Sequence, residues 1–193
     1  MIRTCFFSFF LLIALFGFAQ KRSFDIILFG NVIGETVVVK TEDGTGDYNY
    51  RLKSNSHAKI LFTERSSNME FDVKYNSGKL YSSLCKVINN GTLAITEIAK
   101  DAQGYLIKKE AEVLRIAQPI TFSSMELYFS EPVSQKQVFS ERMGVFAAFT
   151  KTAPGEYMNK INDVTNIYRY RNGSLYEIEI RKPLGSVYLR ARK

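Results

Sequence analysis

Alternation of apolar and polar side chains along short runs is the feature that most restricts the folds open to this chain. In residues 69–75, Met, Phe, Val and Tyr alternate with Glu, Asp and Lys, and residues 48–53 repeat the pattern with Tyr, Tyr and Leu. Successive side chains of a β-strand point to opposite faces, so each run predicts a strand with one buried and one solvated face. Similar runs, rich in β-branched and aromatic residues, recur at short intervals. The chain is therefore predicted to be a long β meander.

Turn sequences separate these runs. Asn90-Gly91 and Asn172-Gly173 suit two-residue hairpin turns, which need positive φ angles. The segment 43–47 (DGTGD) is too short for a calcium-binding loop and predicts another hairpin turn. The predicted strands cover residues 23–29, 33–41, 47–57, 69–75, 79–88, 92–100, 104–109, 112–116, 136–140, 144–152, 156–161, 165–171, 174–181 and 186–192.

So many short antiparallel strands must close or curl, because an open flat sheet of this size leaves two long edges and an uncovered apolar face. We therefore predict an all-β fold, in which the antiparallel meander forms a barrel or a strongly curved half-barrel. A β-sandwich is the alternative, since alternation alone does not separate one sheet from two. One short helix is predicted over residues 125–129, with Ser123 or Ser124 as its cap and Pro132 as its stop.

The first nineteen residues differ in kind from the rest of the chain. Arg3 is the only charge among them, and residues 6–18 are almost wholly apolar. This run is too short to cross a hydrocarbon core, which takes roughly 20 residues, but it suits the apolar part of a secretory signal. Gly17 and Ala19 supply the small side chains that signal peptidase needs. We predict a signal peptide at 1–19, cleaved after Ala19, and a single β-rich domain at 20–193 that is soluble in the periplasm or outside the cell and spans no membrane.

The charge balance is basic. The chain has 26 Lys and Arg against 19 Asp and Glu, a formal net charge of +7. Such a surplus favours contact with anionic surfaces, such as the lipid headgroups of a cell envelope. The basic residues are scattered and accompany no nucleic-acid-binding motif, so nucleic acid is not an expected partner.

Sequence motifs for catalysis are missing. There is no Gly-x-Ser-x-Gly elbow, no glycine-rich phosphate loop and no Cys-x-x-Cys pair, and the chain has one histidine. His57 is expected on the surface, and Cys85 is expected to be buried and inert. Glu126, Glu131 and Glu141 are candidates for acid–base work, but we interpret them as solvated loop carboxylates. The prediction is a protein that is not an enzyme and has no cofactor and no metal site.

Three segments resemble an uncharacterised family of exported Bacteroidota proteins, a domain of unknown function with the hallmark LYFxEP followed by VFSExxG. They are FDIILFGNVIGETVV near the start, ITFSSMELYFSEP with VFSERMG in the middle, and IYRYRNGSLYEIEI near the end. The resemblance spans nearly the whole mature chain and implies the same compartment and fold. It implies no activity and no catalytic residues.

Two functions fit these observations. In the first, the barrel holds a lipid or another apolar small molecule, because barrel mouths are common ligand sites. Leu127, Tyr128 and Phe129 would then form a plug or lid over a cavity lined by Phe122, Phe146, Phe149, Tyr168 and Tyr170. In the second, the same aromatic residues fill a solid core, and the protein is a structural or interaction module of the envelope. Its partner would bind at an edge strand or an exposed loop.

Overall fold

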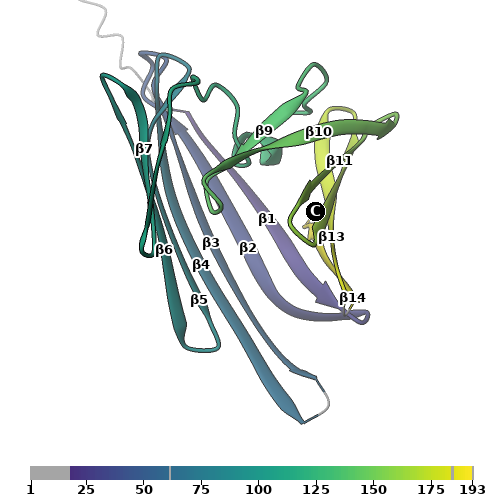
Figure 1. The fold of residues 1–193 in the computed structure, drawn as a ribbon. Helices are drawn as coiled ribbons and strands as arrows, with labels where there is room; N and C mark the ends of the chain where they lie inside the picture. The colour runs from purple at the N-terminus through teal and green to yellow at the C-terminus, as the bar shows by residue number, and fades with distance from the viewer. Residues whose placement is uncertain (1–17, 61, 184, 193) are drawn as a thin grey trace, which may run out of the picture.

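Fourteen strands and one short helix make up the protein in this computed structural model, which describes residues 18–60, 62–183 and 185–192 (Figure 1). The helix, η1, is a single 3₁₀ turn at Glu126–Tyr128. The strands are β1 (Ala19–Leu28), β2 (Asn31–Glu42), β3 (Tyr48–Ile60), β4 (Thr63–Asn76), β5 (Lys79–Asn89), β6 (Thr92–Asp101), β7 (Gly104–Lys109), β8 (Glu112–Ile116), β9 (Gln137–Ser140), β10 (Val145–Ala153), β11 (Glu156–Ile161), β12 (Val164–Arg171), β13 (Ser174–Lys182) and β14 (Gly185–Ala191).

All the strands belong to one antiparallel sheet. The order is β8-β7-β6-β5-β4-β3-β2-β1-β14-β13-β12-β11-β10-β9, so the first and last strands of the chain are neighbours in its middle. Their register joins Phe24 to Ala191 and Leu28 to Val187. Figure 1 shows the sheet curling strongly from β7 round to β10. Within the described residues no strand pairing closes the sheet, and the predicted half-barrel is confirmed.

The two ends of the sheet meet through a turn instead of a strand pair. The turn between β9 and β10 reaches the inner side of β6 and β7, where the Thr96 hydroxyl donates to the Arg142 carbonyl at 2.9 Å. Gly144, with φ 69°, lies so close to β7 that an added Cβ would come within 2.8 Å of an Ile107 methyl group. A side chain at this position would force either the Ile107 side chain or the turn to move.

The apolar core lies on the concave side of the sheet and has two parts. One part is formed mainly by β2 to β7, and the other by β1 and β9 to β14. Residues 117–136, which we call the inner segment, run between β8 and β9 and contribute to both parts. Ile120 and Met125 pack into the first part and Leu127 packs into the second. The inner segment therefore holds the two halves of the curled sheet together.

The β3–β4 hairpin is longer than predicted. We expected its second strand to begin at Met69, whereas β4 begins at Thr63. Residues 54–57 and 66–68 are small or polar on both faces, so they lack the alternation that reveals a strand. Backbone pairing from Tyr48↔Tyr75 to Ile60↔Thr63 extends the hairpin through them.

A ladder of ion pairs crosses the outer face of the sheet. Arg192 hydrogen-bonds to Asp25 and Glu35, which joins β14 to β1 and β2. Farther along, the Arg169 guanidinium binds three carboxylates at 2.6–2.9 Å, from Glu156, Glu177 and Glu179. These pairs tie neighbouring strands together on the side away from the core.

The predicted signal peptide falls almost wholly outside the described residues. Of residues 1–19, the structure describes Phe18 and Ala19, and Ala19 begins β1 opposite Thr41. No helix among the described residues is both long and apolar enough to cross a membrane.

Candidate functional site

The inner segment carries the hallmark residues and lies against both halves of the sheet. Leu127 is fully buried, and Tyr128 and Phe129 are partly buried. The Tyr128 ring meets Phe24 of β1 edge-on, with the ring centres 5.5 Å apart. The Phe129 ring stacks on Tyr50 of β3 at the same separation. This packing is what a plug requires, and the choice between plug and lid stays a prediction that unfolding measurements can test.

Glu141, at the end of β9, fixes the start of η1. Its carboxylate is buried and accepts hydrogen bonds from the hydroxyls of Ser123 and Ser124. It also accepts from the backbone N–H groups of Ser124 and Met125, at 3.2 and 3.3 Å. Burial raises the pKa of this carboxyl group. Glu141 therefore occupies the position that a helix-capping side chain normally takes.

The predicted serine cap was wrong. Met125 is the residue before η1, and no side chain of its own turn caps the helix. Both serine hydroxyls donate to Glu141 instead. A hydrogen-bonded carboxylate is the stronger acceptor for the free N–H groups at a helix start, which explains the exchange of roles.

Glu126, the first residue of η1, is also buried. It is 8% exposed and accepts a hydrogen bond of 3.1 Å from the Tyr48 hydroxyl. Burial raises the pKa of Glu126 to about 7, and the nearby Glu141 adds to the shift, while Tyr48 and Lys40 oppose it. Glu131 hydrogen-bonds to Tyr157. The interpretation of these residues as solvated loop carboxylates was therefore wrong for Glu126 and Glu141, because the loop folds into the sheet.

A group of tyrosines from β3 and β4 surrounds Glu126 on the inner face of the sheet. Tyr48 and Tyr75 stack with ring centres 4.8 Å apart, and Tyr50 meets both edge-on. The Lys40 ammonium lies 4.6 Å from the centre of the Tyr48 ring. The Tyr75 hydroxyl is buried and has no hydrogen-bond partner among the described residues. The tyrosine group therefore joins the sheet to the inner segment, because the Tyr48 hydroxyl of β3 is hydrogen-bonded to the Glu126 carboxylate of η1.

The five aromatic residues predicted to line a ligand cavity fall into both parts of the core. Phe149, Tyr168 and Tyr170 are buried in the second part, and Phe122 packs against it. Phe146 packs against the first part. The Tyr170 hydroxyl of β12 donates to the Leu127 carbonyl at 2.7 Å, which links β12 to the inner segment. Their role in ligand binding stays a prediction.

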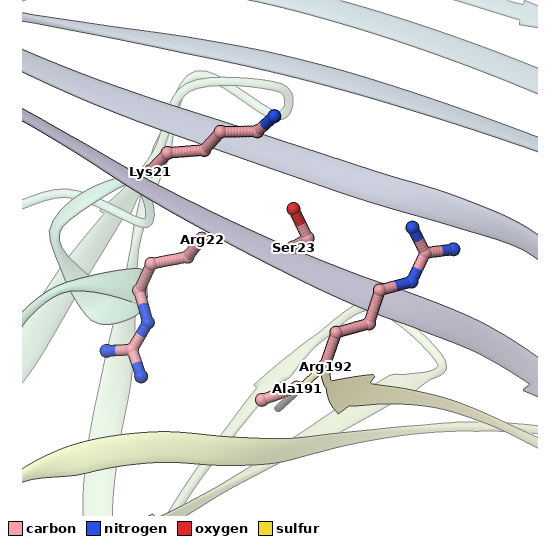
Figure 2. Close-up of a pocket in the computed structure, with 5 residues that line it drawn as sticks. All are labelled: Lys21, Arg22, Ser23, Ala191 and Arg192. Atoms are coloured by element: carbon pink, nitrogen blue, oxygen red, sulfur yellow. The ribbon is translucent and has the colours of Figure 1, made fainter.

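Two surface cavities do not involve these aromatics. One, of about 400 Å³, lies where β14 ends beside β1 and is lined by Lys21, Arg22, Ser23, Ala191 and Arg192 (Figure 2). The other, of about 110 Å³, lies at the β2–β3 turn and is lined by Thr41, Glu42, Asp43, Asp47, Tyr48 and Asn49. Both are lined mainly by polar residues.

Arg22 was not singled out from the sequence, yet it secures the inner segment. Its guanidinium donates to the carbonyl of Tyr128 at 3.1 Å and to that of Leu175 at 3.2 Å. Figure 2 shows it pointing away from Lys21 and Arg192. Alternation along β1 places Arg22 on the inner face, which is the one signal that could have indicated its role.

The other residues considered for chemistry lie apart. Cys85 is buried, as predicted, and burial raises its pKa to about 12. His57 is exposed on β3, with Glu64 at 3.7 Å. In the parts of the chain that the structure describes, no three Cys, His, Asp or Glu side chains are grouped as a metal site requires.

The two edges of the sheet differ. The inner segment covers β9, where the Phe139 N–H donates to the Phe122 carbonyl at 3.1 Å and the Phe139 carbonyl accepts from Ser124 at 2.8 Å. The opposite edge, β8, pairs with β7 and with no other described strand. On β8, Val113 is 63% exposed and Leu114 is 44% exposed. One edge is thus protected and the other is bare.

Comparisons with known proteins agree with this architecture. A crystal structure of a β-barrel-like protein of the domain of unknown function DUF1849, from Brucella abortus, is similar with a TM-score of 0.61. The two chains are 10% identical over 90% of this chain and 95% of that one, so the likeness shows the fold alone. No curated protein matches this chain. Residues 24–192 match the family described as a domain of unknown function (DUF6134), and the chain belongs to that family.

Proposed function

We propose that this protein is a non-enzymatic exported module that acts through its surface, where a partner protein adds an extended segment to β8. The observation that carries the proposal is the difference between the two edges of the sheet. The inner segment covers β9, whereas β8 has a strand on one side only within the described residues. A bare edge strand offers a row of backbone donors and acceptors for an added strand.

The side chains of β8 suit such an addition. Val113 lies opposite Lys108 on one face, and Leu114 lies opposite Ile107 on the other, so an added strand would meet an apolar side chain on each face. The strand contains neither proline nor lysine; its charged residues are Glu112 and Arg115, and Val113 and Leu114 between them are exposed and apolar. An extended segment with apolar side chains on both faces is the partner that fits this edge.

The packing of the interior favours the function with a solid core and argues against a site for an apolar ligand. Phe149, Tyr168 and Tyr170 would have to separate from each other and from the inner segment to admit a ligand. Native mass spectrometry of protein purified from its own host tests this point directly. A retained apolar molecule would favour the ligand-binding function instead.

Photocrosslinking tests the β8 proposal. A photoreactive residue at Val113 in living host cells should yield one protein adduct, and the same residue at Tyr81, exposed on β5, should not. A synthetic peptide covering the crosslinked stretch should then bind the purified protein and slow amide exchange in β8. The same peptide with alternate backbone amides methylated should not bind, because it cannot complete the ladder. Binding of the methylated peptide, or protection of strands other than β8, would overturn the proposal.

A further inference from the structure

Several of the exposed apolar side chains lie at one end of the sheet. The turns β1–β2, β3–β4, β5–β6 and β13–β14 all lie at this end, which is the lower end in Figure 1, and the β3–β4 hairpin projects beyond the others. Five large apolar side chains at or beside the first three of these turns are exposed, and we call them the apolar rim: Phe29, Val32, Phe62, Ile88 and Leu93.

Phe62 is the most exposed of the five. It lies in the turn of the longest hairpin and is 98% exposed, so its ring has almost no contact with the rest of the protein. A Phe ring gains free energy when it leaves water for an apolar environment. Phe62 does not gain this free energy within the fold, because it lies exposed in the turn that projects farthest from the core.

Phe29 stands where its turn favours a different residue. It has φ 49° and precedes Gly30 with φ 81°, the positive pair of angles of a tight hairpin turn. The matching positions before Gly91 and Gly173 hold Asn90 and Asn172, and Asn tolerates positive φ better than a bulky aromatic residue does. Phe29 is nevertheless 67% exposed. One edge of the ring lies beside Gly185 at the start of β14, and most of the ring is exposed although its backbone is strained.

Basic side chains flank these rings. Lys59 and Arg65 are exposed on either side of Phe62, and Lys182 is exposed at the β13–β14 turn. Glu64 is the one carboxylate beside them at the β3–β4 turn. Aromatic tips with adjacent Lys and Arg side chains match the two layers of a bilayer surface, in which anionic headgroups cover acyl chains.

We propose that the apolar rim docks on a lipid bilayer with anionic headgroups. Phe62 and Phe29 enter the boundary between headgroups and acyl chains, and Lys59, Arg65 and Lys182 contact headgroup phosphates. Separate tips spread over several hairpins suit a fluid surface, which adapts to each tip, better than a single protein groove. The full chain has a net charge of +7, of which the predicted signal peptide holds only Arg3, and the remaining positive charge supports attraction to such a surface. This docking is independent of strand addition at β8, which lies on the edge of the sheet.

Vesicle flotation tests the inference with the purified protein. The protein should float with vesicles made of equal parts phosphatidylcholine and phosphatidylglycerol, and at least tenfold less with phosphatidylcholine alone. Phe62→Asn with Phe29→Asn should lower flotation at least tenfold without lowering the melting temperature, because Asn suits the Phe29 turn. Tyr81→Asn is the control: it removes an exposed aromatic ring from the other end of β5, away from the apolar rim, and should float like the wild type. Soluble glycerol phosphate should not displace the protein if the bilayer, and not a free phosphate group, is recognised.

A fluorescent reporter gives a second, direct readout. The chain contains no Trp, so Phe62→Trp provides a single emitter at the tip. Its emission should shift to shorter wavelength on the anionic vesicles, whereas Tyr81→Trp should not shift. Wild-type protein that stays unbound, or a Phe62→Asn, Phe29→Asn protein that floats normally, would overturn the inference. A rim that binds a protein in place of vesicles would do the same.

Discussion

The buried carboxylate of Glu141 accepts a hydrogen bond from the backbone N–H of Met125, 3.3 Å away, and so caps a helix sixteen residues earlier in the chain. Two serine hydroxyls and a second N–H donate to the same carboxylate. The inner segment thus depends on one buried carboxyl group just after β9, and this makes its stability easy to test.

Replacing Glu141 by Ala should destabilise the protein strongly. The change leaves several buried donors without an acceptor, which costs about 2–4 kcal/mol by the usual scale for such groups. Denaturant unfolding measures the loss. Glu131→Ala, which removes one hydrogen bond to Tyr157, should cost about 1 kcal/mol. An equal effect of the two substitutions would show that Glu141 does not anchor the inner segment.

Stability should fall as the pH rises from about 4.5 to about 7. Burial raises the pKa of Glu126 from 4.5 to about 7, so the folded protein holds this proton more tightly than the unfolded chain. The resulting stabilisation is complete below about pH 4.5 and is lost as the pH rises through the folded-state value, an effect of about 2–3 kcal/mol. Melting temperatures over this range measure it. The hydrogen bond from Arg181, followed by that from Arg169, lowers the pKa of Glu179 to about 2, so that group titrates outside the window.

Glu126→Gln is the variant that assigns this pH dependence. It should flatten the profile in part, because the pKa of Glu141 is also raised by burial. A flat wild-type profile would contradict the raised pKa.

Truncating Phe129 to Ala separates a plug from a lid. The ring stacks on Tyr50, so a plug should lose about 3 kcal/mol of stability. A mobile lid is weakly packed and should lose little in the ligand-free protein. Denaturant unfolding with an unchanged slope and a loss under about 1 kcal/mol would establish the lid.

Arg169→Ala should cost more than Arg190→Ala on the outer ladder. Arg169 is the more buried of the two and binds three carboxylates, one of them the buried Glu179. Its loss leaves these carboxylates close together without a partner, and we expect the free energy of unfolding to fall by about 2–3 kcal/mol. Arg190 is largely exposed and binds Glu177, so Arg190→Ala should lower the free energy of unfolding by about 0.5 kcal/mol. Thermal unfolding of both variants at low and high salt tests this order, and equal losses would contradict it.

Processing of the precursor stays a prediction with a simple test. Mass spectrometry of the protein recovered from the envelope or medium should find Gln20 as the first residue, free or cyclised. Cleavage there removes the Phe18 carbonyl, which accepts from the Glu42 N–H at 3.0 Å, so the β1–β2 pair would begin one bond later. An intact Met1 in the recovered protein would refute the predicted signal peptide.

Local pattern was enough to predict most of the strand residues, because an alternating run identifies a half-buried strand. Residues 69–75 alternate and form part of β4, whereas residues 63–68 do not and were missed although they pair with β3. The residues that hold the inner segment in place, Arg22 and Glu141, could not be identified from the sequence around them. Arg22 bonds to carbonyls 106 and 153 residues away, and nothing in its own neighbourhood indicates those partners. The same is true of Glu141, whose burial depends on how a distant loop folds.

The junction of β1 with β14 sets the order in which the molecule can be completed. Strands β1 to β8 can pair one after another through short hairpins, which is a rapid process with local contacts. The free side of β1, however, must wait for the last strand of the chain, since Phe24 pairs with Ala191. A chain emerging from a membrane translocon would therefore expose the β1 edge until its final residues had passed. Until then that edge is an unpaired strand edge, which is a template for pairing with other chains.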